Sequence, residues 1–183
     1  MGHRVAVLSG GHLQQCASPR ELYDNPVNQF VAGFIGSPAM NLLNAPLTEG
    51  GATLAGAVIP LSPGVRAAAA RDKLTGLVVG IRPEHLHLAD AAGTGPGAGG
   101  RAAASVSPGG PVSTSAVLGG EVLLVEELGA DALLHVRLDD DGGAVVARTE
   151  GRKSPAPGQR VSFRVQPDDV FAFHPATGAR LAG

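Results

Sequence analysis

The sequence has no tryptophan, one tyrosine, five phenylalanines and one cysteine among its 183 residues. A single cysteine cannot form an intramolecular disulfide, which suits a cytosolic protein. The formal net charge of −2 excludes a general electrostatic attraction to nucleic acid or to an anionic membrane surface. No apolar run approaches the roughly 18 residues of a transmembrane helix. We therefore expect any association with a membrane to occur only through partner proteins.

Small aliphatic residues, glycine and proline take the place of the missing aromatics. We expect a core built from alanine, valine and leucine. The 27 glycines and 14 prolines cluster in sequence, most densely in residues 91–115, which consist almost wholly of Ala, Gly, Pro, Ser and Thr. Such a segment cannot bury enough apolar surface to offset the entropy lost on ordering. It is therefore predicted to be a flexible insert in an otherwise ordered chain.

Residues 18–41 are predicted to form a helical connector between two different kinds of structure. Ser18 can cap a short helix that starts at Pro19, and Glu21 completes a capping box. Asn25-Pro26 should interrupt this helix, because the residue before a proline disfavours the helical conformation.

A second connector helix is predicted to be capped by Asn25, with Pro26 at its first position. Its apolar residues recur at helical spacing and should form one buried stripe. This stripe consists of Val27, Phe30, Val31, Phe34 and Ile35. Gly36 should end the helix just before Ser37-Pro38.

Strands and turns are expected on both sides of the connector. Residues 4–8 and 12–16 are predicted to form a hairpin around Ser9-Gly10-Gly11. After residue 41 only strands and turns are expected, except that residues 65–70 could be helix or loop. Gly119-Gly120 should form a bulge or kink. The predicted later strands are residues 53–61, 76–81, 116–125, 132–138, 144–148, 161–165 and 170–173. Among these, roughly five short strands at a spacing of about 8–12 residues indicate a small OB-type barrel.

Several motifs occur in an order that resembles one family. They are F-V-A-G-F-I-G-S-P-A-M-N at residues 30–41, V-G-I-R-P-E-H-L at 79–86, V-E-E-L-G at 125–129 and P-G-Q-R-V-S-F at 157–163. The chain resembles the C-terminal part of the ATP-binding subunit of ABC carbohydrate importers, of the maltose, trehalose and sn-glycerol-3-phosphate types. The resemblance covers nearly the whole chain except the insert.

The resemblance implies a mainly β fold, in which an OB-like (TOBE-type) regulatory barrel follows a short β-hairpin and a helical connector. Residues 1–17 would be the terminal hairpin of a truncated nucleotide-binding domain, residues 18–41 the connector, and residues 42–183 the OB-like regulatory domain. We expect no ATP hydrolysis, because the chain contains no G-x-x-x-x-G-K-[ST] phosphate loop. No catalytic, nucleotide-binding or metal-binding residue is predicted, and no cofactor, although the full-length family uses ATP and Mg²⁺.

Leu8-Ser9-Gly10-Gly11-His12 nearly spells the L-S-G-G-Q signature of this ATPase class. That signature presents backbone N–H groups and a helix N-terminus to a nucleotide phosphate. No helix is predicted to start at these glycines, so a hairpin turn is the better interpretation.

The resemblance also implies partners and a location. The intact subunit would form a homodimer through its regulatory domain and would dock on the permease subunits of an importer, at the cytoplasmic face of the cell membrane. ATP-driven closure would then energise uptake of a sugar or sugar-like solute. The permease and the external binding protein usually select the solute, so this chain does not identify it. The alternative function is a free-standing OB-like module that binds a small anion or a regulatory ligand.

Six residues are candidates for a dimer or regulatory interface. Ser37, Pro38, Met40 and Asn41 could contribute to a subunit contact, although a helix stop and an entry turn are the favoured interpretation, because a Gly-Ser-Pro stop needs no partner to explain it. Arg82 and Glu84 flank a proline at a strand end, where a guanidinium could bind a carboxylate across an interface. A local ion pair within the domain is the favoured interpretation, because most such pairs are local.

Other polar residues are interpreted as structural or solvated. His85 and His87 lack a third ligand for a metal site. Glu126, Glu127 and Asp131 are expected in a solvated turn. Cys16 has no basic neighbour in sequence that would make it reactive.

Overall fold

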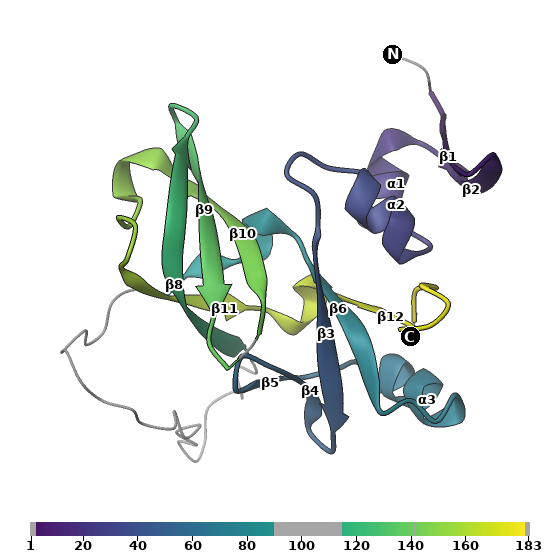
Figure 1. The fold of residues 1–183 in the computed structure, drawn as a ribbon. Helices are drawn as coiled ribbons and strands as arrows, with labels where there is room; N and C mark the ends of the chain where they lie inside the picture. The colour runs from purple at the N-terminus through teal and green to yellow at the C-terminus, as the bar shows by residue number, and fades with distance from the viewer. Residues whose placement is uncertain (1–2, 90–114, 141, 182–183) are drawn as a thin grey trace.

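The computed structural model describes residues 3–89, 115–140 and 142–181. These residues form three antiparallel sheets and a few short helices (Figure 1). The prediction of a mainly β fold is confirmed. The predicted insert lies outside the described residues, apart from Ser115 at its end. Among the helices that the described residues form, none is both long and apolar enough to cross a membrane.

The N-terminal hairpin forms as predicted. Strand β1 (Val5–Ser9) pairs with β2 (His12–Ala17), from Val5 opposite Ala17 to Ser9 opposite His12. Gly10 and Gly11 lie between them with positive φ angles of 53° and 82°, which glycine adopts without strain. The near-signature at residues 8–12 is therefore a hairpin turn. Figure 1 shows this hairpin beside the two connector helices, away from strands β8 to β11.

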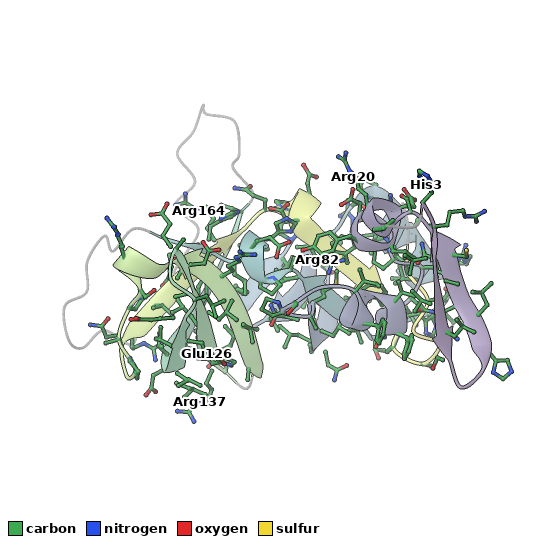
Figure 2. All side chains as sticks on the ribbon, turned by 90° about the horizontal axis from the view of Figure 1, so that it is seen from above. His3, Arg20, Arg82, Glu126, Arg137 and Arg164 are labelled. Atoms are coloured by element: carbon green, nitrogen blue, oxygen red, sulfur yellow. The ribbon has the colours of Figure 1, made fainter. Side chains whose placement is uncertain are left out.

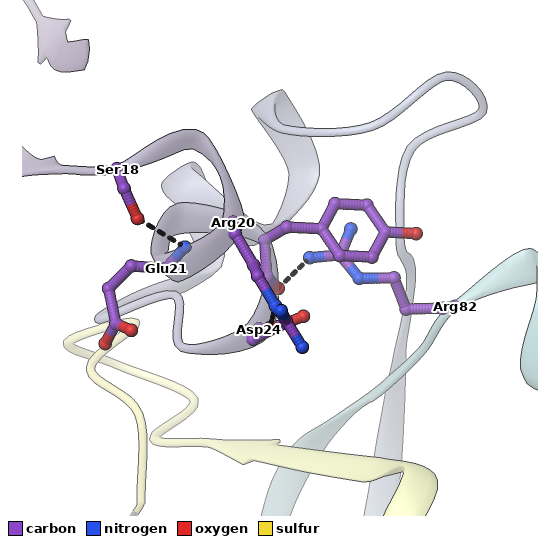
Figure 3. Close-up of polar contacts among 6 residues, drawn as sticks. Ser18, Arg20, Glu21, Asp24 and Arg82 are labelled. Carbon is purple, nitrogen blue, oxygen red and sulfur yellow. Dashed lines mark hydrogen bonds and ion pairs between the residues drawn. The ribbon is translucent and has the colours of Figure 1, made fainter. Parts of the chain in front are cut away.

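The first connector helix, α1 (Pro19–Asp24), begins where the sequence predicts. The Ser18 hydroxyl accepts a hydrogen bond from the Glu21 amide at 3.2 Å, and Pro19 occupies the first turn (Figure 3). The prediction that Asn25 caps the second helix is wrong. Asn25 instead ends α1, where its amide donates to the Glu21 carbonyl at 2.8 Å.

The second connector helix, α2 (Gln29–Phe34), is capped by Asn28, whose side chain accepts from the Val31 amide at 2.9 Å. The predicted apolar stripe is only partly buried. Val31 is fully buried, but Phe30 and Phe34 are exposed and stack on each other with ring centroids 5.9 Å apart. A helix of six residues buries one turn of its stripe, which leaves the remainder in solvent.

One five-stranded sheet has the order β12-β6-β3-β4-β5. Its strands are β3 (Asn41–Thr48), β4 (Gly51–Leu54), β5 (Ala57–Ile59), β6 (Gly76–Ile81) and β12 (Val170–Phe173). A helix, α3 (Pro63–Arg71), lies between β5 and β6, so of the two alternatives left open for residues 65–70 the helix is the one that forms. Ser62 caps α3 by accepting from the Val65 amide at 3.3 Å, and Pro63 starts it. The Ser-Pro pair is the same start signal that opens α1.

The other five-stranded sheet has the order β10-β9-β8-β11-β7. Its strands are β7 (His87–Leu88), β8 (Ala116–Glu127), β9 (Asp131–Leu138), β10 (Ala144–Glu150) and β11 (Arg160–Val165). Short 3-10 turns link these strands to the rest: η1 (Pro83–His85), η2 (Gly151–Lys153) and η3 (Pro167–Asp169).

The bulge in β8 lies between Val122 and Leu124, and the predicted bulge at Gly119-Gly120 is wrong. Gly120 is needed for a different reason. A Cβ atom there would lie 2.7 Å from the Arg137 carbonyl oxygen of the neighbouring strand. Glycine thus permits a close approach of the two backbones without a bulge.

Side chains from both five-stranded sheets form the largest hydrophobic cluster. Leu134, Val136 and Leu138, which alternate along one face of β9, are buried in it, together with Phe163 of β11. The cluster otherwise consists mainly of small aliphatic side chains, as the composition predicts. A C-terminal turn follows β12, and Phe173 forms an antiparallel bridge with Arg180 across it.

Candidate functional site at the connector–barrel junction

We call the two five-stranded sheets together the barrel. The connector, residues 18–41, meets the barrel where strand β6 ends. Arg82 follows β6 directly, and Pro83 begins the 3-10 turn η1. Figure 2 shows Arg82 in the middle of the molecule, between the barrel strands and the connector. Its side chain points into the junction, and the residue is only 1% exposed. A charge this deeply buried requires partners.

The partners of Arg82 are the free carbonyls at the ends of both connector helices. Nη1 donates to the Ile35 carbonyl at 2.8 Å. Nη2 donates to the Tyr23 carbonyl at 2.5 Å (Figure 3). The last carbonyls of a helix accept no hydrogen bond from an amide of the same helix, and a cation near them is favourable. One guanidinium therefore caps α1 and α2 together.

The aromatic ring of Tyr23 completes the environment of Arg82. The guanidinium carbon lies 3.5 Å from the ring centroid, in cation–π geometry. The Tyr23 hydroxyl donates a hydrogen bond to the Glu84 carboxylate. Arg82 and Glu84 thus both contact Tyr23 of α1. Arg82 contacts its carbonyl and the face of its ring, and Glu84 contacts its hydroxyl.

Burial sets the protonation equilibria in the junction. Desolvation lowers the pKa of Arg82, with the nearby Tyr23, Glu84 and Asp24 acting in the opposite direction. Desolvation, followed by the hydrogen bond to Glu84, raises the pKa of Tyr23 to about 12. The phenol is therefore held as a proton donor to Glu84 across the physiological range.

A second set of contacts holds the connector from the C-terminal turn. The Gln29 amide donates to the Gly178 carbonyl at 2.9 Å, and the Arg180 amide donates to the Val27 carbonyl at 2.9 Å. The Arg180 side chain also donates to Asn25 Oδ1 at 3.1 Å and lies over the Phe171 ring at 4.9 Å. These contacts hold residues 27–29 to the C-terminal turn, so α2 is capped by Asn28 rather than Asn25.

Met40 and Asn41, two of the predicted interface residues, lie inside the chain. The Asn41 side chain donates to the carbonyls of Ile81, at 3.0 Å, and Val146, at 2.9 Å, and accepts from the Val146 amide at 2.8 Å. It thereby joins the β3–β6 sheet to the edge strand β10. Met40 packs in a small cluster with Phe173.

Ser37 and Pro38 lie on the outside of the junction. They line a cavity of about 450 Å³ between the end of the connector and the outer face of β8, β9 and β10. Its other lining residues are Glu126, Leu128, Leu133, His135, Val146 and Arg148. Of the six predicted interface residues, Ser37 and Pro38 open to this surface, Glu84 is half-buried, and Met40, Asn41 and Arg82 are buried.

Acids and bases alternate around this cavity. His135 Nε2 lies 2.7 Å from Glu126 Oε1, and Arg148 forms an ion pair with Asp131. The predicted solvated turn is therefore partly wrong, because Glu126 and Glu127 lie at the end of β8 and Asp131 starts β9. Each acid of these two pairs faces a base on the neighbouring strand.

The remaining sequence candidates do not form a metal site. His85 Nδ1 lies 3.6 Å from Asp169 Oδ1 and makes no hydrogen bond with the described residues, while His87 is exposed. Within the part of the chain that the structure describes, no group of three or more His, Cys, Asp or Glu side chains is arranged to hold a metal ion.

Sequence reasoning missed Tyr23, His135 and Arg148. Tyr23 is the only tyrosine in the chain, and this rarity was the one available signal. His135 and Arg148 were recognisable only as outward positions of alternating strands.

Comparison with known proteins agrees with this architecture. The TOBE domain family matches residues 79–173, and the MalK OB fold domain matches residues 36–86. A solved structure of the cytoplasmic molybdate-binding protein ModG superposes with a TM-score of 0.45 and 15% identity, over 74% of this chain and 96% of that one.

ATP-binding proteins of transport systems are similar along nearly the whole of this chain. The diacetylchitobiose uptake system ATP-binding protein MsiK of Streptomyces coelicolor is 38% identical over 99% of this chain and 46% of its own length. The sn-glycerol-3-phosphate import ATP-binding protein UgpC of Ruegeria sp. is 36% identical over 100% of this chain and 43% of its own length. The chain thus spans about half the length of these relatives. The chain belongs to the TOBE domain family and corresponds to the OB and TOBE region of ATP-binding subunits of ABC sugar importers.

Proposed function

We propose that this chain is the regulatory and dimerisation portion of an ATP-binding subunit that energises ABC-type import of a sugar or sugar-like solute. The observation that carries this proposal is the similarity along the whole chain to ATP-binding proteins of diacetylchitobiose and sn-glycerol-3-phosphate uptake systems. Two copies would associate with each other and with the permease subunits of an importer, at the cytoplasmic face of the membrane.

The junction geometry supports a regulatory role. Arg82 caps both connector helices from the barrel side, and the C-terminal turn holds the start of α2. A displacement of the barrel would therefore move α1 and α2 with it, because packed elements shift as units rather than deform continuously. The regulatory domain and the connector would act as one body.

We further propose that ATP and Mg²⁺ act elsewhere in the subunit and that this chain alone does not hydrolyse ATP. The sequence contains no phosphate-binding loop. Isothermal titration with ATP and Mg²⁺, together with a phosphate-release assay, should detect neither binding nor turnover by the purified chain. Reproducible turnover would overturn this part of the proposal.

A second titration distinguishes the proposed regulatory domain from the alternative, an anion-binding module. Sulfate, molybdate and phosphate should give no saturable heat with the purified chain if it serves as a dimerising regulatory domain. Saturable micromolar binding of one of these oxyanions would instead favour the alternative.

A further inference from the structure

The N-terminal hairpin, the start of α2 and the C-terminal turn enclose a second cavity, of about 320 Å³. It shares no lining residue with the larger cavity at the junction. Its volume lies at the lower end of the roughly 300–1,000 Å³ that small-molecule sites occupy. Its walls include four polar side chains and one aromatic ring, from Gln14, Asn28, Gln29, Thr177 and Phe30.

No charged side chain is among the described residues that line this second cavity. An ion is poorly accommodated in such a place, because no opposite charge compensates for its lost hydration. A neutral polar molecule avoids that cost and can exchange its hydrogen bonds to water for hydrogen bonds to the wall. The lining therefore favours an uncharged ligand that forms hydrogen bonds.

Hydrogen bonds within the chain fix the amides of the cavity wall. Asn28 Nδ2 donates to Gln14 Oε1 at 2.8 Å, and Asn28 Oδ1 accepts from the Val31 amide at 2.9 Å. Gln29 Nε2 donates to the His174 carbonyl at 3.3 Å. The wall is thus largely set before a ligand arrives, which lowers the entropy cost of binding.

The same side chains keep hydrogen-bonding capacity beyond these bonds. An amide nitrogen carries two hydrogens, and those of Gln14 and Asn28 each donate one bond to the residues described. Gln29 Oε1 accepts none from those residues. The Thr177 hydroxyl accepts from the Ala179 amide at 3.3 Å and donates to none of them. Neighbouring donors and acceptors of this kind match a ligand whose hydroxyls each donate and accept.

Phe30 supplies an apolar surface beside these polar groups. Its ring stacks on Phe34, with centroids 5.9 Å apart and planes 7° from parallel, and the residue is still 41% exposed. The face of an aromatic ring carries partial negative charge, which attracts the weakly positive C–H groups of a saturated ring. A flat aromatic ring next to amides therefore suits a pyranose sugar, which has C–H groups on its faces and hydroxyls around its edge.

We propose that this second cavity binds one pyranose unit of a neutral saccharide. The sugar ring packs on Phe30, and its hydroxyls exchange hydrogen bonds with Gln14, Asn28, Gln29 and Thr177. The bound sugar contacts the hairpin, the connector and the C-terminal turn at once. This inference goes beyond the proposed function and does not rest on dimerisation or on transport.

The first test is a saturation-transfer NMR titration of the wild-type chain with glucose, trehalose and sorbitol, in which the aromatic protons of the chain are irradiated. Glucose and trehalose should bind saturably, with dissociation constants of about 1 mM, because few ligand atoms make contacts in a small cavity. Their C–H protons should receive saturation from Phe30. Sorbitol has the hydroxyls of a sugar but no ring, so it should bind at least about tenfold more weakly.

The second test removes the stacking surface with Phe30→Ala, at an exposed position. This change should raise the dissociation constant of glucose about tenfold. The matched control is Phe34→Ala, because Phe34 is exposed and stacks on Phe30 but is not among the lining residues. The control should change the dissociation constant by less than about twofold.

The third test removes one hydroxyl and keeps the shape of the side chain. Thr177→Val should raise the dissociation constant of glucose about fivefold, because one hydrogen bond to the sugar is lost. Thr149→Val, on strand β10, is the matched control and should leave glucose binding unchanged.

The outcomes decide the inference without touching the proposed function. No saturable binding of glucose or trehalose up to about 20 mM, well above the expected constant, overturns it. Sorbitol binding as tight as glucose binding overturns recognition of the sugar ring, and this comparison needs no variant. Equal losses in Phe30→Ala and Phe34→Ala overturn the assignment to this cavity. Selective losses in Phe30→Ala and Thr177→Val support it.

Discussion

At the scale of single residues, Arg82 does the most to fix the junction. It is buried, it donates to carbonyls at the ends of two helices, and it lies against the ring of Tyr23. Lysine cannot reproduce this arrangement, because its ammonium is a point charge without the planar fork of guanidinium. The geometry, rather than the charge alone, holds the connector to the barrel.

Replacing Arg82 by lysine should therefore destabilise the chain. We expect Arg82→Lys to lower the free energy of unfolding by about 2 kcal/mol, because at least one helix-end carbonyl loses a charged donor. Urea unfolding followed by circular dichroism measures the change. The control is Arg20→Lys, whose exposed pair with Asp24 should contribute less than about 0.5 kcal/mol. Equal losses in the two variants would contradict the role of Arg82.

Tyr23 offers a direct spectroscopic readout, because it is the only tyrosine and the chain has no tryptophan. In the folded chain its phenol should titrate with a pKa of about 12, against about 10 in an unfolded chain. Because the pKa is raised on folding, the protonated Tyr23 phenol stabilises the folded chain fully below about pH 10. This stabilisation is lost as the pH rises through about 12. Ultraviolet absorbance of tyrosinate measures this titration.

Glu84→Gln should move the Tyr23 pKa part of the way back. Burial is the largest cause of the shift and stays, while the contribution of the carboxylate is lost. Glu127→Gln, on an exposed strand end, is the matched control and should leave the titration unchanged. A folded wild-type chain whose tyrosine titrates near pH 10 would contradict the buried hydrogen bond.

At the scale of elements, α2 depends on contacts from outside itself. A six-residue helix is far too short to be stable alone. It is held by Arg82 at its end and by the C-terminal turn at its start. The side chain of Arg180 lies over the Phe171 ring and donates to Asn25, and burial lowers the pKa of its guanidinium.

Removing the Arg180 side chain should loosen α2 specifically. In Arg180→Ala we expect the amides of α2 to exchange with deuterium about tenfold faster, which corresponds to about 1.4 kcal/mol of local opening free energy. Hydrogen exchange with mass spectrometry measures this. Arg66→Ala, on the exposed face of α3, should leave α2 unchanged. Uniform acceleration over the whole chain would indicate global destabilisation and would count against a local clamp.

The elements that the sequence predicts well are those with local causes. The hairpin, the Ser18 cap and the inward face of β9 follow from turn chemistry, capping and alternation. The cap of α2 was predicted wrongly because Gly178 and Arg180, from the far end of the chain, hydrogen-bond to Gln29 and Val27. The bulge at Leu123 was also missed, since register depends on the partner strand.

At the scale of the whole molecule, Asn41 joins the two large sheets through three hydrogen bonds. The family motif identified this residue but could not show that its side chain faces β10 rather than a second subunit. The same limit applied to Arg82, because its partners at Tyr23 and Ile35 are distant in sequence. The motif located the junction, and only the fold showed which of its residues are buried.

Asn41→Ala should separate the sheets at this point. We expect a loss of about 2 kcal/mol in the free energy of unfolding, because the amide and carbonyl of Val146 lose their buried partner. Asn44→Ala, on the same strand but exposed, is the control and should change stability by less than about 0.5 kcal/mol. Equal values from thermal or urea unfolding would contradict this link.

Sedimentation equilibrium of the wild-type chain, with and without ATP and Mg²⁺, tests whether it is a dimerising regulatory domain that does not itself use ATP. We expect a monomer–dimer equilibrium with the same dissociation constant in both conditions. A chain that stays monomeric, or that dimerises only when ATP is present, would contradict the proposed function.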